Sequence, residues 1–134
     1  MTHIAQVPER FAEVVADFGW RTAPGPEQLA GQWEQVVDLV EAGYEDNIYE
    51  YHNDLTVRGL IDRLLTDEEL RGDERLDGFR ARIAQVDTRL RNLLTSAPVH
   101  DIAGPWWETR VPVYAGEELA KDLRDRYGVD VEVR

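Results

Sequence analysis

The chain has 134 residues, with 27 acidic against 15 basic side chains and a formal net charge of -12 at neutral pH. This length suits one hydrophobic core, so we expect a single domain over residues 1–134. The absence of cysteine excludes disulfides, thiolate metal sites and a cysteine nucleophile. The acidity argues against nucleic-acid binding, and no apolar run reaches the roughly 20 residues of a membrane span. Without a signal-peptide pattern at its N-terminus, the chain is expected to be cytoplasmic.

Two helices are predicted in the N-terminal part. The first opens at Pro8 and ends at Gly19, and the second opens at Pro26. The second helix has an apolar stripe at 3- and 4-residue spacing, made of Leu29, Trp33, Val36, Val37, Val40 and Tyr44. Its opposite side carries an acidic stripe without a basic residue, made of Glu27, Glu34, Asp38, Glu41 and Glu45. Residues 1–50 hold -8 of the net charge, which uniform solubilisation does not predict.

Two further helices are predicted in the middle of the chain. The third is capped by Asp54 or Thr56, after a tyrosine-rich acidic segment, and the fourth runs from about residue 73 to 95. The fourth helix has a heptad seam of Leu76, Phe79, Ile83, Val86, Leu90 and Leu93, flanked by Arg75, Arg82 and Arg89. Such a seam favours packing inside one domain over an intermolecular coiled coil.

Strand-forming residues appear only near the C-terminus. A short strand is predicted within residues 106–113, and Val129, Val131 and Val133 alternate with polar residues in a second one. Between them, residues 117–127 read as a helix closed by Gly128. The predicted fold class is mainly α, a single helical bundle-like domain with a small two-stranded β-α-β or hairpin-like appendage near the C-terminus.

Candidate catalytic groups are sparse, and we expect no enzyme, no cofactor and no metal. His3, His52 and His100 are far apart in the sequence, so no helical ligand pair exists. Ser96, the sole serine, lacks the flanking glycines of a nucleophile elbow. No glycine-rich phosphate loop occurs. A metal or general-base role for His52, or for His100 beside Asp101, stays open as a minor alternative.

Aromatic residues are the more informative candidates. If Trp106 and Trp107 lie on a strand, one fills the core and the other faces outward, although both could pack over the bundle. Tyr44, Tyr49 and Tyr51 stand among carboxylates, which suits an interface with lysine and arginine side chains or a half-buried position.

Two strings carry a resemblance, Glu50–Arg58 (EYHNDLTVR) and Trp106–Pro112 (WWETRVP). Over roughly residues 44–126 the chain resembles a loosely defined group of short acidic bacterial proteins without an accepted activity. In size, acidity and layout it is also similar to immunity proteins, which neutralise toxins of contact-dependent growth inhibition and related systems. This second resemblance implies an inhibitor but transfers no residue roles.

The leading hypothesis is therefore a cytosolic immunity-type inhibitor, a monomer or weak homodimer, that covers a basic, nuclease-like toxin domain. Carboxylates would mimic the polyanionic substrate, with aromatic anchors excluding water. The expected partner-binding residues are Glu34, Asp38, Glu41, Glu45, Asp46, Tyr49, Glu50 and Asp54. The alternatives are a regulatory module that self-associates through the seam at 76–93, and a small enzyme or ligand-binding domain around His52 or His100.

Overall fold

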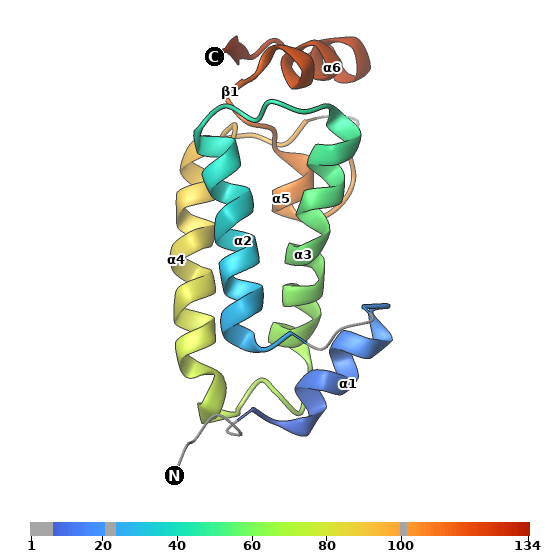
Figure 1. Ribbon diagram of the computed structural model, residues 1–134. Helices are drawn as coiled ribbons and strands as arrows, with labels where there is room; N and C mark the ends of the chain where they lie inside the picture. The colour runs from blue at the N-terminus through green and yellow to red at the C-terminus, as the bar shows by residue number, and fades with distance from the viewer. Residues whose placement is uncertain (1–6, 21–23, 100–101) are drawn as a thin grey trace.

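A computed structural model describes residues 7–20, 24–99 and 102–134 (Figure 1). Three long helices stand side by side as an elongated bundle, a short helix flanks one end, and a small β-α-β unit covers the other. The mainly α class with a C-terminal appendage is confirmed. The helices are α1 (Glu9–Asp17), α2 (Pro26–Glu41), α3 (Ile48–Thr66), the 3-10 turn η1 (Glu74–Leu76), α4 (Asp77–Leu93), α5 (Trp106–Thr109) and α6 (Glu117–Tyr127), and the strands are β1 (Tyr114–Ala115) and β2 (Glu132–Val133).

The heptad seam of α4 packs inside the chain, chiefly against α2. Its side chains from Leu76 to Leu90 are buried, with Phe79 the most exposed of them at 7%, and Leu93 is partly buried. The apolar stripe of α2 meets it, and Trp33 and Val37 are fully covered. Self-association through the seam would therefore require the bundle to open.

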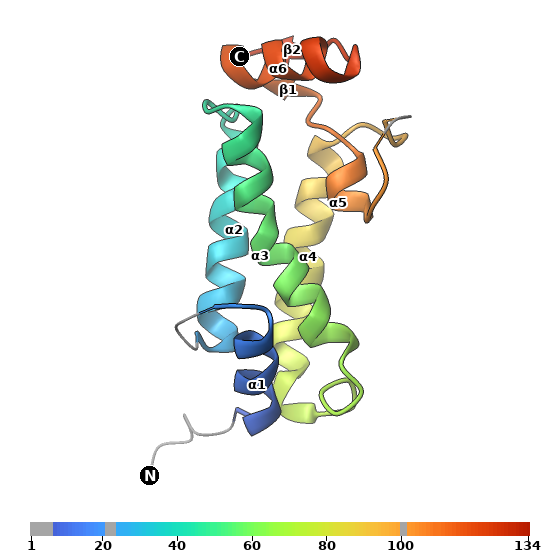
Figure 2. The ribbon, with the colours of Figure 1, turned by 90° about the vertical axis from the view of Figure 1, so that its right-hand side faces the viewer.

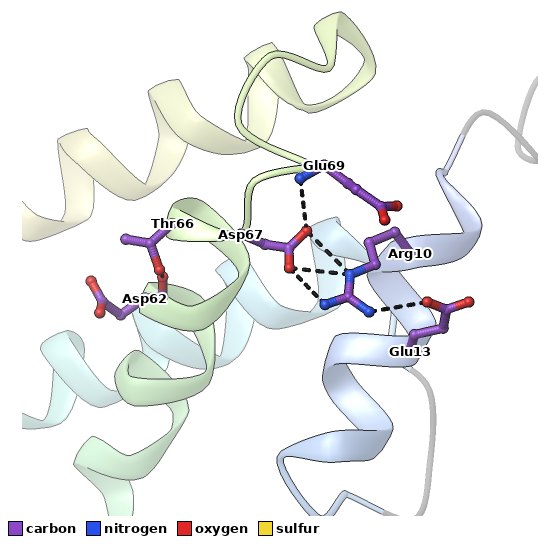
Figure 3. A network of polar contacts seen from close by, with 6 residues as sticks. All are labelled: Arg10, Glu13, Asp62, Thr66, Asp67 and Glu69. Atoms are coloured by element: carbon purple, nitrogen blue, oxygen red, sulfur yellow. Dashed lines mark hydrogen bonds and ion pairs between the residues drawn. The ribbon is translucent and has the colours of Figure 1, made fainter.

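Helix α1 closes the lower end of the bundle. The ring of Phe11 meets that of Phe79 edge-on at 5.9 Å. Figure 3 shows Arg10 of α1 reaching across to Asp67, just after α3, with Nη2 2.8 Å from Oδ1, while its Nη1 lies 3.1 Å from Glu13. These hydrogen bonds raise the pKa of Arg10 and lower that of Asp67. The contacts fix α1 against the end of α3.

Helix α3 begins earlier than predicted, at Ile48 rather than near Asp54 or Thr56. The cap is Asn47, whose side chain accepts a hydrogen bond from the Glu50 amide at 2.9 Å. The tyrosine-rich segment lacks a simple 3.6-residue apolar period, because it packs on both the bundle and the appendage. The end of this segment therefore belongs to α3, which was predicted to begin only after it.

The predicted strand around the two tryptophans is wrong. Trp106 and Trp107 lie in the single helical turn α5, and the strand β1 follows at Tyr114. Pro105 precedes this turn in an extended conformation, a common way to begin a helix. Trp107 is buried, whereas Trp106 is half-buried beneath the guanidinium of Arg91, 4.1 Å from its ring centre.

The appendage is a β-α-β unit, one of the two predicted arrangements, with its first strand just after the predicted range. Strands β1 and β2 pair in parallel, with Tyr114 opposite Glu132 and Ala115 opposite Val133, and α6 connects them. The unit is fastened to the α2–α3 loop by backbone contacts. The Gly116 amide donates to the Tyr44 carbonyl at 2.9 Å. Asp122 of α6 accepts from the Ile48 amide at 3.0 Å, so the appendage also supports the start of α3.

A polar cluster lies inside the bundle, with one residue from each of α2, α3, α4 and α5. The Asp87 carboxylate accepts from Arg58 Nε at 3.0 Å and Nη2 at 2.9 Å, and from the indole N–H of Trp33 at 2.9 Å. The Arg58 guanidinium lies 4.4 Å from the Trp107 ring centre. Arg58 is 5% and Asp87 7% exposed. Hydrogen bonds and an aromatic face replace part of the water that this charge pair loses. Arg58 Nη1 and the indole nitrogen of Trp107 are buried without a hydrogen-bond partner among the described residues.

Asp87→Ala is expected to lower the free energy of unfolding by about 3 kcal/mol or more, because it strands a buried guanidinium. The matched control is Asp77→Ala on the same helix, whose side chain is 74% exposed and pairs weakly with Arg80. It should lose no more than about 1 kcal/mol. Urea unfolding followed by circular dichroism measures both losses, and equal losses would contradict a central role for the cluster.

Gly116→Ala should loosen the appendage, since an added Cβ would lie 2.7 Å from the Tyr44 carbonyl oxygen. The backbone must shift to relieve this contact, at a cost of about 1–3 kcal/mol. Gly72→Ala is the control, because its Cβ would meet nothing within 4 Å and its φ is not positive. We expect faster hydrogen exchange at the Ile48 amide and along α6 in the Gly116 variant, and no such change in the Gly72 variant.

Candidate binding surface

The acidic stripe of α2 does not face solvent alone, because α4 places arginines beside it. Arg82 Nη2 lies 3.1 Å from Glu34, and Arg89 Nη2 lies 2.8 Å from Asp38 and 3.2 Å from Glu41. These arginines lie seven residues apart on α4, and α4 packs on α2, so both arginines face the carboxylates of α2. The pairing with Asp38 raises the pKa of Arg89. Three of the five carboxylates of the stripe are thus paired with arginines of the same chain.

The remaining predicted carboxylates gather where α2 turns into α3. Glu45, Asp46 and Glu50 are exposed, and among the described residues none of them forms an ion pair. The segment is rigid, because the Asp46 carboxylate accepts from the Asn47 amide at 2.7 Å and Asn47 in turn caps α3. Together with Tyr49 these residues are named the acidic corner.

Tyr49 is the exposed aromatic of the acidic corner, with 64% of its surface accessible. Arg126 of α6 lies 4.8 Å from its ring centre and donates a hydrogen bond to its hydroxyl at 2.9 Å. This contact leaves much of the ring open to solvent. An exposed tyrosine ring near carboxylates can contact lysine and arginine side chains by cation–π interactions and hydrogen bonds.

The other two tyrosines belong to the core. Tyr44 is 4% exposed, and its hydroxyl donates to Asp54 at 2.6 Å, so that Asp54 is half-buried. Tyr51 meets the Tyr44 ring edge-on at 5.3 Å, and its hydroxyl is fully buried. Burial raises the pKa of both phenols, and the Asp54 carboxylate raises that of Tyr44 further.

The histidine alternative gains no structural support. His52 is half-buried beside Tyr51, and burial together with the charge of Arg126 lowers its pKa. Within the described part of the chain, no three histidine, aspartate or glutamate side chains are grouped to hold a metal. His3, His100 and Asp101 lie outside the described residues. Ser96 is exposed at a bend.

No protein-family model, curated protein or solved structure matches the chain. In the described part of the chain, no helix has the length and apolar character needed to cross a membrane. The surface must therefore be interpreted from its own chemistry.

Alkaline titration tests the packing behind the acidic corner. The raised pKa values of Tyr44 and Tyr51 mean that the folded state favours their neutral phenols. Their contribution to the stability of the fold is therefore complete below the ordinary pKa of 10.0 and declines as the pH rises above it. Absorbance at a phenolate wavelength should show a component that ionises only as the protein unfolds. Replacing both tyrosines by Phe should remove it; its persistence in that variant would contradict the assignment.

Proposed function

We propose that this chain is a binding protein whose acidic corner recognises a basic protein partner. The observation that carries the proposal is the contrast between two sets of carboxylates. Glu34, Asp38 and Glu41 already share Arg82 and Arg89, so a partner must compete for them. The carboxylates of the acidic corner have no such competitor among the described residues and stand beside the exposed ring of Tyr49.

The specific form of the proposal is an immunity-type inhibitor acting in the cytoplasm on a nuclease-like toxin domain, as in contact-dependent growth inhibition. A nuclease active site is basic because it holds a polyanion, and fixed carboxylates satisfy the same lysine and arginine side chains. The net charge of -12 speeds the encounter through long-range attraction. Support comes from the charge, the small size and the rigid presentation of the acidic corner.

The test compares two variants of equal charge change. Glu45→Gln/Asp46→Asn/Glu50→Gln neutralises the acidic corner, and Glu68→Gln/Glu69→Gln/Glu74→Gln neutralises three exposed carboxylates at the other end of the bundle. Tagged proteins are used to capture partners from the lysate of the host at low salt. We expect the wild type to capture a basic protein that high salt releases. This partner should associate about tenfold more slowly with the corner variant than with the control.

Three results would contradict the proposal. The first is the absence of a basic partner on the wild type, and the second is an equal slowing by both variants, which would reduce the effect to net charge. The third result bears on the inhibitor form alone. It is a captured partner that does not cleave nucleic acid, or whose cleavage continues after stoichiometric addition of this chain. A partner without such activity refutes immunity while leaving the binding function.

A further inference from the structure

An open groove of about 330 Å³ lies between α2 and α3, next to the acidic corner. Helix α1 runs beside the lower end of α2 and α3 (Figure 2). Trp20, which follows α1, also contributes to the groove. The groove is lined by Trp20, Gln32, Gln35, Val36, Leu39, Asn53, Asp54, Thr56 and Val57.

Among the described residues that line the groove, Asp54 alone is charged, although the chain as a whole is strongly acidic. Val36 and Val57 form an apolar floor and are 8% and 5% exposed. Leu39 stands at the rim with 51% of its surface accessible. The groove therefore offers an apolar seat of the size of one or two side chains.

Side-chain amides stand on both walls of the groove, Gln32 and Gln35 on α2 and Asn53 on α3. An amide donates and accepts hydrogen bonds at once, which matches the free N–H and C=O groups of an extended backbone. A helix has already used those groups internally. Gln32 to Leu39 spans about 10 Å at 1.5 Å per helical residue, or roughly three residues of extended peptide.

One end of the groove is negatively charged, which sets the direction in which a bound peptide lies. Asp54 lines the groove, and its Oδ2 accepts from the Tyr44 hydroxyl. Asp54 forms no ion pair among the described residues, so its carboxylate can receive a cation. Glu50 lies one turn earlier on α3 and adds negative charge on the side of the acidic corner. An occupant with a lysine or arginine at this end is favoured over a neutral or acidic one.

We infer that this groove binds a short extended segment of the basic partner. One apolar side chain of the segment lies against Leu39, Val36 and Val57, its backbone bonds the side-chain amides, and a lysine or arginine reaches Asp54. The inference rests on the proposed function, since it names the part of the partner that is recognised.

The test uses random displayed peptides and needs no natural partner. Peptides are selected on the immobilised full chain and depleted on Leu39→Gln, which removes the apolar rim without changing charge. The control is Val133→Gln, because Val133 is 53% exposed and lies on β2, away from the groove. Circular dichroism checks that each variant is folded.

Enriched peptides are expected to combine an apolar residue with a nearby lysine or arginine. Their affinity should fall about tenfold in Leu39→Gln and in Asp54→Asn and stay within about twofold in Val133→Gln. In spectra of the nitrogen-15-labelled protein, the side-chain amide signals of Gln32, Gln35 and Asn53 should shift on binding. Peptides without a basic residue, peptides that bind as helices, or no enrichment over Leu39→Gln would each overturn the inference.

The two proposals fail separately. If the groove selects no peptide but the corner variant still slows capture of the basic partner, the partner binds without an extended segment in the groove, and the proposed function survives. If basic peptides bind the groove but no basic protein is captured from the host, the groove assignment survives as peptide recognition, and the proposed function is wrong.

Discussion

The buried pairing of Arg58 with Asp87 is the contact on which the arrangement of the helices depends. It joins α3 to α4 by two hydrogen bonds, and the same carboxylate takes the indole N–H of Trp33 from α2. Trp107 of α5 lies over the guanidinium. An apolar core tolerates sliding of one helix past another, whereas the three hydrogen bonds to Asp87 form in one register only, because a shift removes the partners of two buried charges.

The register of α2 and α4 also decides which surface carboxylates have an arginine partner. With α2 and α4 aligned by the buried cluster, Arg82 and Arg89 stand opposite Glu34, Asp38 and Glu41. Exposed pairs of this kind contribute little to stability. Their larger effect is to reduce the field of the α2 stripe, so that the unpaired negative charge of this part of the chain is concentrated at the acidic corner.

The appendage makes the acidic corner rigid. It bonds the loop at Tyr44, supports the first turn of α3 through Asp122, and places Arg126 against Tyr49. A preorganised loop loses less conformational entropy when it binds. The groove between α2 and α3 adds side-chain amides, apolar side chains and the carboxylate of Asp54. In the function we propose, the corner attracts the partner and the groove adds specificity.

Much of the fold follows from the sequence alone. Apolar residues at 3- and 4-residue spacing, with Pro26 and Gly128 as boundaries, determine α2, α4 and α6, because burying such stripes requires helices packed together. The alternation of Val129, Val131 and Val133 indicates β2 in the same way. Local patterns also identify the carboxylates and Tyr49 as surface candidates.

Tertiary structure alone decided what those residues do. Whether a carboxylate is free depends on side chains about 50 positions away, as in the pairs of Arg82 and Arg89 with α2. The helical turn at Trp106 depends on packing against the bundle, which overrides the strand preference of its residues. The start of α3, in contrast, has a local signal that the sequence prediction missed, because Asn47 caps the helix through the Glu50 amide. The groove exists only because α2 and α3 lie side by side, a relation that no local pattern encodes.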